Sequence, residues 1–210
     1  MYKLLKRIVI SGHPGTGTTT LIDQLAKLYN LKPEQKIKIG DLFRQNAKEI
    51  TGQDITSFYQ RDITEDLSID NMQKKLLSDP NPELIFILES RLGGFFTGEI
   101  REKAKNSGTL PPPIVTVLLT TDEKVRFKRV YQRDKQTNPA LNYQQVSEQI
   151  KQRQEQDFKQ WQQAYPDISQ NPLDEVNLYD LHVDNTNLNI DQTVEVVNER
   201  LTKMGALEKI

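Results

Sequence analysis

The chain has 210 residues, of which 36% are hydrophobic and 27% are charged, and its formal net charge is -1. This length suffices for one α/β domain with a sizeable core, and the near-neutral charge argues against DNA, RNA or an anionic membrane as a partner attracted by the overall field. The sequence has no Cys, which excludes disulfides and thiolate metal sites, and it has no apolar run of secretory or membrane-spanning length, so we expect a cytoplasmic protein.

Strand and helix patterns alternate along the chain. Residues 7–11 (RIVIS) form a short apolar, β-branched run, and residues 18–28 follow with a helical spacing of apolar side chains. Residues 36–39 are typical of a second strand, after which Asp41 is a candidate cap for the next helix. Helical patterns then cover residues 54–77, 124–132, 143–165 and 190–204, and strand patterns cover residues 84–88, 114–119 and 181–184.

This alternation predicts the α/β class. Parallel strands joined by helices form a sheet that is covered by helices on both faces, and such sheets bind ligands at the carboxyl ends of their strands. The strand patterns above predict a parallel five-stranded sheet of this kind. Because no linker is visible, we expect residues 1–210 to form a single domain with helical insertions.

A glycine-rich segment joins the first strand to the first helix. Its residues are Gly12, His13, Pro14, Gly15, Thr16, Gly17, Thr18, Thr19 and Thr20. Glycines allow the backbone N–H groups to turn inward, and a helix N-terminus adds partial positive charge. The segment therefore predicts a P-loop that binds ATP phosphates, with the Thr19 hydroxyl as a Mg²⁺ ligand. A purely structural turn is the alternative.

Position 18 departs from the usual P-loop pattern, in which Lys precedes the Ser/Thr. Thr18 stands there instead, and the loss of the Lys removes roughly a few kcal/mol of transition-state stabilisation unless another cation replaces it. Either other basic side chains close over the phosphates, or the protein binds nucleotide and performs little chemistry.

Basic and acidic side chains follow two of the predicted strands. Arg44 lies at the start of the helix after the second strand, and Glu89 and Arg91 lie just past the carboxyl end of the third. Two arginines there would hold the phosphate of an acceptor through forked hydrogen bonds, and Glu89 would order the Mg²⁺ water shell or the acceptor base. Surface salt bridges are the alternative for either arginine.

Further arginines lie on the two long polar helices. Arg129 and Arg133 are four residues apart on one face, with Arg126 on the same helix and Arg153 on the next. A helical hairpin with inward arginines would fold over ATP and neutralise the charge that develops on the transferred phosphoryl group. For Arg126 a solvated basic face is an equally good interpretation.

Six segments resemble the archaeal-type cytidylate kinases, which belong to the adenylate-kinase-like P-loop kinases. They read ISGHPGTGTTT (residues 10–20), GDLFRQNAKE (40–49), ILESRLGGFF (87–96), VRFKRVYQRDK (125–135), RQEQDFKQWQQAYPDI (153–168) and LYDLHVDNT (178–186). The resemblance implies transfer of the γ-phosphoryl group of ATP to CMP or dCMP, with ATP and Mg²⁺ required. It also implies a P-loop kinase fold with a monophosphate-binding flap near residues 41–79 and a lid near residues 133–157.

The same resemblance assigns roles to individual residues. Thr18 fits, because Thr in place of the loop Lys is common in this family. The acceptor-binding residues would be Asp41, Arg44, Glu89 and Arg91. The catalytic arginines would be Arg91, Arg129, Arg133 and Arg153. The residues beside adenine would be Asp184, Asn185 and Thr186. Ser90 and Pro166 stand where the family often has Gly, and the Ser90 change touches the acceptor pocket.

Other polar and aromatic residues are assigned structural places. We expect the His13 side chain to face solvent or the lid and His182 to lie in the core. Asp70 is expected to lie on a helix surface, with a contact to the acceptor base as the alternative. Trp161 and Tyr165 are expected to serve packing.

Two other functions stay open at this point. One is a P-loop kinase for AMP, UMP or a non-nucleotide acceptor, and the other is a nucleotide-binding regulator that lost catalysis with the loop Lys. In each case the partners are small-molecule nucleotides, and the small size favours a monomer.

Overall fold

The computed structural model describes residues 2–44 and 63–209. At its centre is a five-stranded parallel sheet with the strand order β3-β4-β2-β5-β6. The strands are β2 (Arg7–Gly12), β3 (Lys36–Lys38), β4 (Ile87–Glu89), β5 (Ile114–Thr120) and β6 (Leu181–Asp184). All six residues of β2 are buried, as expected for a central strand covered on both faces. The predicted α/β class with a parallel five-stranded sheet is confirmed.

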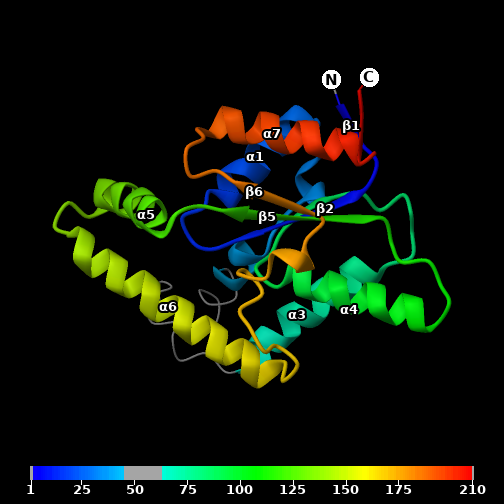
Figure 1. The fold of residues 1–210 in the computed structure, drawn as a ribbon, viewed down its shortest axis with the longest axis horizontal. Coiled ribbons are helices and arrows are strands. Elements are labelled where there is room, and N and C mark those ends of the chain that lie inside the picture. The colour runs from blue at the N-terminus through cyan, green and yellow to red at the C-terminus, as the bar shows by residue number, and fades with distance from the viewer. Residues whose placement is uncertain (1, 45–62, 210) are drawn as a thin grey trace.

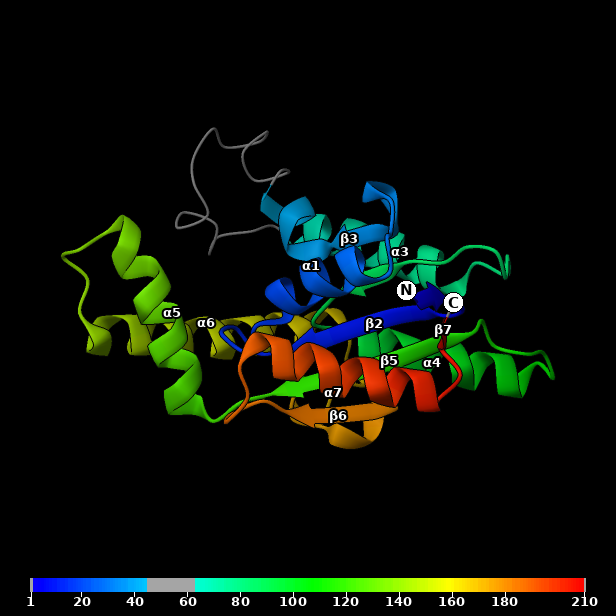
Figure 2. The ribbon, with the colours of Figure 1, turned by 90° about the horizontal axis from the view of Figure 1, so that it is seen from above.

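Two layers of helices cover this sheet (Figure 1, Figure 2). On one face lie α1 (Thr18–Leu28) and α7 (Ile190–Lys203), and on the other lie α3 (Ile63–Ser78) and α4 (Gly93–Asn106). The helices α5 (Glu123–Thr137) and α6 (Tyr143–Ala164) extend beyond the carboxyl end of β5. Single 3-10 turns are η1 (Pro33–Gln35) and η3 (Val176–Leu178).

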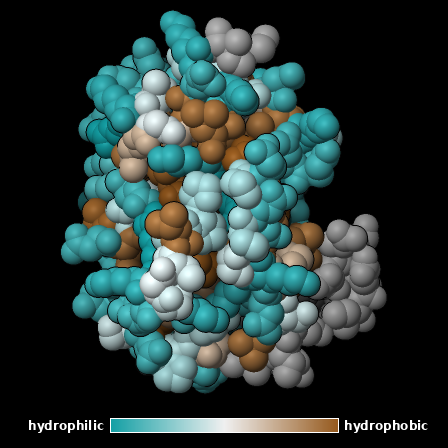
Figure 3. All heavy atoms as spheres, turned by 90° about the vertical axis from the view of Figure 1, so that its right-hand side faces the viewer, coloured by the Kyte–Doolittle hydropathy of each residue, from teal (hydrophilic) through white to brown (hydrophobic). Residues whose placement is uncertain are grey.

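Two apolar cores hold these layers together. The first joins the sheet to α1 and α7 and includes Ile8, Leu25 and Val197, each fully buried. The second joins the opposite face to α3, α4 and the end of α6, and it includes Phe86 and Phe96. Figure 3 shows the end of the molecule away from α5 and α6, where apolar atoms form small patches among mostly hydrophilic ones.

A separate two-stranded sheet lies near both ends of the described chain. The strands β1 (Tyr2–Leu4) and β7 (Leu207–Lys209) pair in antiparallel register, Tyr2 opposite Lys209. Neither was predicted, because three residues are too few for a recognisable period of two. The helix α4 was also not predicted, since it begins with Gly93 and Gly94, which are poor helix formers.

The third predicted strand is shorter than its apolar run. Residues 84–88 were expected to form it, yet β4 begins at Ile87. The reason is that side chains take the earlier carbonyl groups: Arg7 Nε donates to Leu84 O at 2.9 Å, and Gln35 Nε2 donates to Ile85 O at 3.1 Å.

Several helix boundaries also differ from the predictions. Helical backbone begins at residue 39, before Asp41, so Asp41 does not cap that helix and instead accepts a hydrogen bond from Arg44. The expected helix over residues 54–77 is described as α3 from Ile63, and residues 45–62 lie outside the described part. The helix α5 begins after Asp122, whose side chain caps it. It runs to Thr137 instead of residue 132, because residues 133–137 contain no Gly or Pro that would end it earlier.

Two buried–exposed assignments were wrong. His182 is exposed at the sheet edge and shares a 2.7 Å hydrogen bond with Thr120 Oγ1, so it is not a core residue. Asp70 is 6% exposed and therefore does not lie on the surface. Its carboxylate accepts hydrogen bonds from Gln73 Nε2 and the Tyr165 hydroxyl, both at 2.9 Å, which satisfy the buried charge.

Candidate active site

The glycine-rich segment forms a tight turn between β2 and α1. A Cβ atom on Gly12 would lie 2.7 Å from the Leu119 carbonyl oxygen, and one on Gly15, whose φ is +89°, would lie 2.7 Å from the Arg126 carbonyl oxygen. Neither position accepts a side chain. The free N–H groups of the first turn of α1 follow directly, which is the arrangement that binds a phosphate.

Two hydroxyl groups at the start of α1 share one acceptor. Thr18 Oγ1 donates to Glu89 Oε1 at 2.6 Å, and Thr19 Oγ1 donates to the same oxygen at 2.7 Å. Glu89 ends β4, so the β2–β4 pairing sets this contact. Thr18, which stands where a P-loop Lys is usual, is thus bound to the carboxylate and brings no charge.

The same residues fit a Mg²⁺ ion that also binds phosphate. No group of three or more His, Cys, Asp or Glu side chains lies together within residues 2–44 and 63–209, so these ranges hold no all-protein metal cage. Mg²⁺ commonly takes one or two protein ligands and completes its shell with water and phosphate oxygens. Thr19 and Glu89 supply oxygens of that kind beside the turn.

Two arginines of α5 contact the backbone of the turn. Arg126 is 6% exposed, and its Nη1 donates to Pro14 O at 3.1 Å. Arg129 Nη1 lies 3.5 Å from Thr16 O. Burial lowers the pKa of both guanidinium groups, but each stays protonated because the ordinary arginine value lies far above neutrality. Positive charge therefore lies beside the turn although Lys is missing at position 18.

The segment after β6 ties Arg129 to the turn. Asn185 is buried, and its side-chain Nδ2 donates to Thr16 O at 2.9 Å. The backbone carbonyl of Asn185 accepts from Arg129 Nη2 at 3.1 Å. Asp184 accepts hydrogen bonds from the N–H and hydroxyl of Thr186, and these bonds lower the pKa of Asp184. The predicted adenine-side segment thus lies against the turn.

Arg133, the next arginine of α5, is not brought to the turn. Its side chain is 71% exposed and pairs with Asp134 Oδ1 at 2.7 Å. Its predicted role as a lid arginine stays a prediction that requires the lid to move.

The predicted acceptor-binding arginines already have carboxylate partners. Arg44 pairs with Asp41, and both side chains are more than half exposed. Arg91 pairs with Asp157 of α6 and lies over the Trp161 ring, 5.2 Å from its centroid. Arg153 Nε lies 3.8 Å from the same Asp157 carboxylate. The structure therefore brings Arg91 and Arg153 together around Asp157, whereas the ion-pair partner of Arg44 is Asp41.

His13 faces α6, one of the two places expected for it. Its Nδ1 accepts from Gln154 Nε2, and its Nε2 donates to Asp174 Oδ1, both at 2.7 Å. The hydrogen bond from His13 is the main cause of the lowered pKa of Asp174. His13 thus connects the turn to the helix that follows α5.

Sequence reasoning missed Asp157, Asp174 and Gln154 as parts of this region. Asp174 lies in an irregular loop where no pattern marks a site, and Gln154 is one of many Gln residues on a polar helix. The spacing of Arg153 and Asp157 was the one available signal, but it is equally typical of a surface ion pair.

A family model described as an AAA domain matches residues 8–163. The chain belongs to the AAA domain family. The matched part of this AAA domain includes β2 from Ile8 onward, the glycine-rich turn, Glu89 and both arginines of α5 that contact the turn.

Curated relatives of this AAA domain cover nearly its full length. The cytidylate kinase of Methanosarcina barkeri is 27% identical over 91% of this chain and 93% of that protein. The cytidylate kinase of Methanopyrus kandleri is 28% identical over 94% and 93%, respectively. The resemblance to archaeal cytidylate kinases is confirmed, and it supports the predicted enzyme class, an ATP-dependent phosphotransferase.

A solved structure shows the same fold at low sequence identity. A gluconokinase from Sinorhizobium meliloti superposes with a TM-score of 0.56 at 14% identity, and the match covers 96% of this chain and 94% of that one. Within the described ranges, no helix of this AAA domain has both the length and the apolar character needed to span a bilayer.

Proposed function

We propose that this protein is a nucleoside monophosphate kinase that transfers the γ-phosphoryl group of ATP to CMP or dCMP. The observation that carries the proposal is the glycine-rich turn, with Arg126 and Arg129 on its backbone and with Thr19 and Glu89 beside it. The choice of a cytidine acceptor is supported by the two cytidylate kinases that this chain resembles over more than nine-tenths of its length.

In this reaction an oxygen of the acceptor phosphate attacks the γ-phosphorus of ATP. The bond between that phosphorus and the β–γ bridging oxygen breaks, which releases ADP. Positioning and charge neutralisation supply most of the catalysis, so no nucleophilic side chain is needed. A Mg²⁺ ion held by Thr19, with Glu89 ordering its water, would neutralise charge on the β- and γ-phosphates.

Each group of residues has a proposed part in this scheme. The turn from Gly12 to Thr20 binds the ATP phosphates, and Asn185 lies on the adenine side. Arg129, with Arg153 and Arg133 after lid closure, compensates charge on the transferred group. Arg44 and Arg91 hold the acceptor phosphate. The insertions that would move on substrate binding are a monophosphate-binding flap near residues 41–79 and a lid near residues 133–157.

One observation favours a second function, nucleotide binding without turnover. Thr18 contributes no charge and is bound to Glu89, so the arginines must replace the positive charge of the missing Lys. If they do not, the protein binds ATP as a regulator.

An acceptor comparison tests the proposal. We expect ADP release from Mg-ATP to be fastest with CMP or dCMP when these are offered in parallel with UMP, AMP and GMP. Turnover with AMP or UMP and none with CMP would replace the proposed acceptor, and ATP binding without turnover under any acceptor would favour the regulator.

A further inference from the structure

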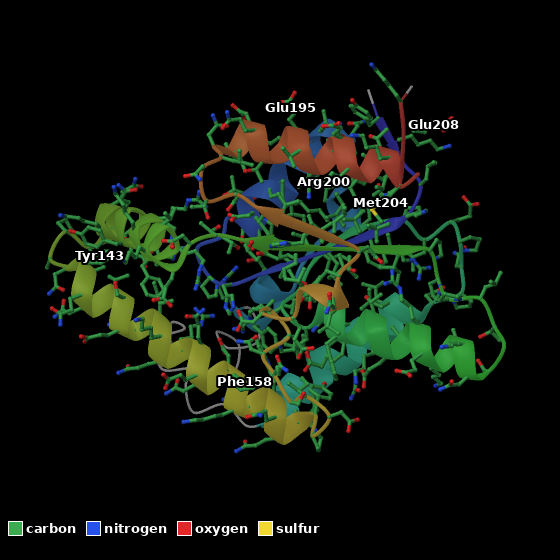
Figure 4. All side chains as sticks on the ribbon, viewed as in Figure 1. Tyr143, Phe158, Glu195, Arg200, Met204 and Glu208 are labelled. Atoms are coloured by element: carbon green, nitrogen blue, oxygen red, sulfur yellow. The ribbon has the colours of Figure 1, made fainter. Side chains whose placement is uncertain are left out.

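The Asp157 side chain connects α6 to the acceptor side of the candidate site. Figure 4 labels Tyr143 at the start of α6, near α5, and Phe158 in the second half of the same helix. Phe158 packs against the second core. Asp157 precedes Phe158, and its side chain is 17% exposed. Its carboxylate accepts from Arg91 Nη1 and lies 3.8 Å from Arg153 Nε. One carboxylate thus serves two arginines that come from different elements.

Arg91 is held in this position by more than the ion pair. It lies in the connection between β4 and α4, and its guanidinium covers the Trp161 ring, one helical turn beyond Asp157. Stacking on an aromatic ring restricts the plane of a guanidinium group and so directs its N–H groups. The side chain of Arg91 is therefore preorganised to bind an oxyanion at the place that Asp157 occupies.

A carboxylate and a phosphate offer similar oxygen acceptors to a guanidinium group. Arginine binds either of them through two parallel N–H···O bonds. A phosphate monoester carries a charge of about -1.5 to -2 near neutral pH, compared with -1 for a carboxylate. A phosphate that enters between Arg91 and Arg153 therefore has the electrostatic advantage over Asp157.

We propose that Asp157 is an internal substitute for the acceptor phosphate and determines which acceptors engage Arg91. This inference rests on the proposed function, because it assigns Arg91 and Arg153 to the acceptor phosphate. Without an acceptor, Asp157 offsets part of the positive charge of the two arginines and holds α6 against the connection before α4. An acceptor phosphate displaces Asp157 from Arg91, whereas a neutral hydroxyl compound does not. The site is thereby restricted to acceptors that carry a phosphate group.

Tryptophan fluorescence provides a direct measurement of this exchange. The sequence contains one Trp, so the emission reports on Trp161 alone. Because the Arg91 guanidinium covers this ring, displacement of Asp157 changes the surroundings of the indole. The probes are CMP, inorganic phosphate and cytidine, which has the same base and sugar as CMP but no phosphate.

The variant Asp157→Asn removes the competing charge and keeps the size of the side chain. We expect it to bind CMP and inorganic phosphate about 3- to 10-fold more tightly than the wild type, the range of a half-buried Arg–carboxylate pair. Cytidine should give no fluorescence change with the wild type. The control is Glu155→Gln, which removes a negative charge from an exposed position on the same helix and should bind like the wild type.

Several results would overturn the proposal. The first is that Asp157→Asn binds phosphate no more tightly than the wild type does. The second is that Glu155→Gln binds phosphate as tightly as Asp157→Asn does, and the third is that no protein shows a fluorescence response. Asp157→Ser serves as a second test of the missing carboxylate, and failure of both Asp157 variants to fold would make Asp157 structural. If Asp157→Asn tightens phosphate binding but no protein makes CDP, the proposed function fails, and what stands is the competition of Asp157 with phosphate for Arg91. If CDP forms without that tightening, the inference alone fails.

Discussion

At the scale of single residues, the question is which side chains provide the positive charge that Thr18 lacks. A P-loop without Lys lacks a point charge at the β- and γ-phosphates. Here Thr18 is bound to Glu89, and Arg126 and Arg129 donate to backbone carbonyls of the turn. Arg126 is almost fully buried and its donor binds Pro14 O, so it acts mainly on the shape of the turn. Arg129 is more accessible and is the better candidate for contact with phosphate.

Replacing Arg129 by Ala tests this assignment. We expect kcat with CMP to fall about 100-fold, as for the loss of a preorganised charge contact in other active sites. Lys128→Ala is the control, because it removes a charge from an exposed position on the same helix. Initial rates of ADP formation measure both. Wild-type kinetics in Arg129→Ala and Arg133→Ala alike would remove α5 from the catalytic machinery.

At the scale of elements, the central sheet and α1 were predictable from the sequence. Their signals are local: the apolar run before the glycine-rich turn and the regular apolar spacing of Leu21, Ile22 and Leu25. The contacts of the site were less predictable. From its position at a strand end, Glu89 was expected to order the Mg²⁺ water shell or the acceptor base, but its two threonine partners depend on strand pairing. The Arg91–Asp157 pair joins residues 66 positions apart, and no periodic pattern reports such a contact.

The start of β4 shows how a buried charge overrides a local pattern. Arg7 is 0% exposed, and its guanidinium donates to three backbone carbonyls, those of Leu84, Leu77 and Asn81. These bonds fix the connection between α3 and β4, which then delivers Glu89 and Arg91 to the site. The apolar pattern of residues 84–88 predicts a strand there, because it carries no information about hydrogen bonds from Arg7, which is far away in the sequence.

Replacing Arg7 by Met tests the importance of this connection. The free energy of unfolding should fall by about 3 kcal/mol, because the charged hydrogen bonds from the buried Arg7 side chain to three backbone carbonyls are lost. Urea unfolding measures the change. Lys3→Met, an exposed site in β1, should change stability by less than about 0.5 kcal/mol. A loss below about 1 kcal/mol in Arg7→Met would mean that other contacts hold the connection.

At the scale of the whole molecule, the site gathers at one end of the sheet. Glu89 is the last residue of its strand, and the turn, Arg91 and Asn185 come just after the carboxyl ends of theirs. The helices α5 and α6 lie beyond that end of the sheet (Figure 1). Several carboxylates that connect distant elements have lowered pKa values, which links the stability of the fold to pH. Their number includes Asp23, Asp174 and Asp180.

Asp180 provides the clearest test of this link. Burial raises its pKa, but hydrogen bonds from Arg101 and from the N–H and hydroxyl of Thr116 outweigh burial and lower it overall. A lowered folded-state pKa gives stability that is present above the unfolded value of about 3.9 and is lost as the pH falls through the folded value.

The Asp180→Asn variant should therefore be less stable than the wild type at neutral pH, and the difference between the two should become small in acid. We expect a deficit of about 1–2 kcal/mol at pH 7 that shrinks below about pH 4, measured by urea unfolding across pH. The matched control is Asp167→Asn, an exposed site, which should follow the wild type. A deficit that stays constant from pH 7 to pH 3 would contradict this origin of the acid sensitivity.

Product analysis tests the central claim most directly. Wild-type protein is incubated with Mg-ATP and CMP, and CDP and ADP are quantified by chromatography beside the Thr18→Lys variant. The account predicts equal amounts of CDP and ADP from the wild type, because the arginines provide the charge that Thr18 lacks. ATP binding without CDP, or CDP formed by Thr18→Lys alone, would contradict it.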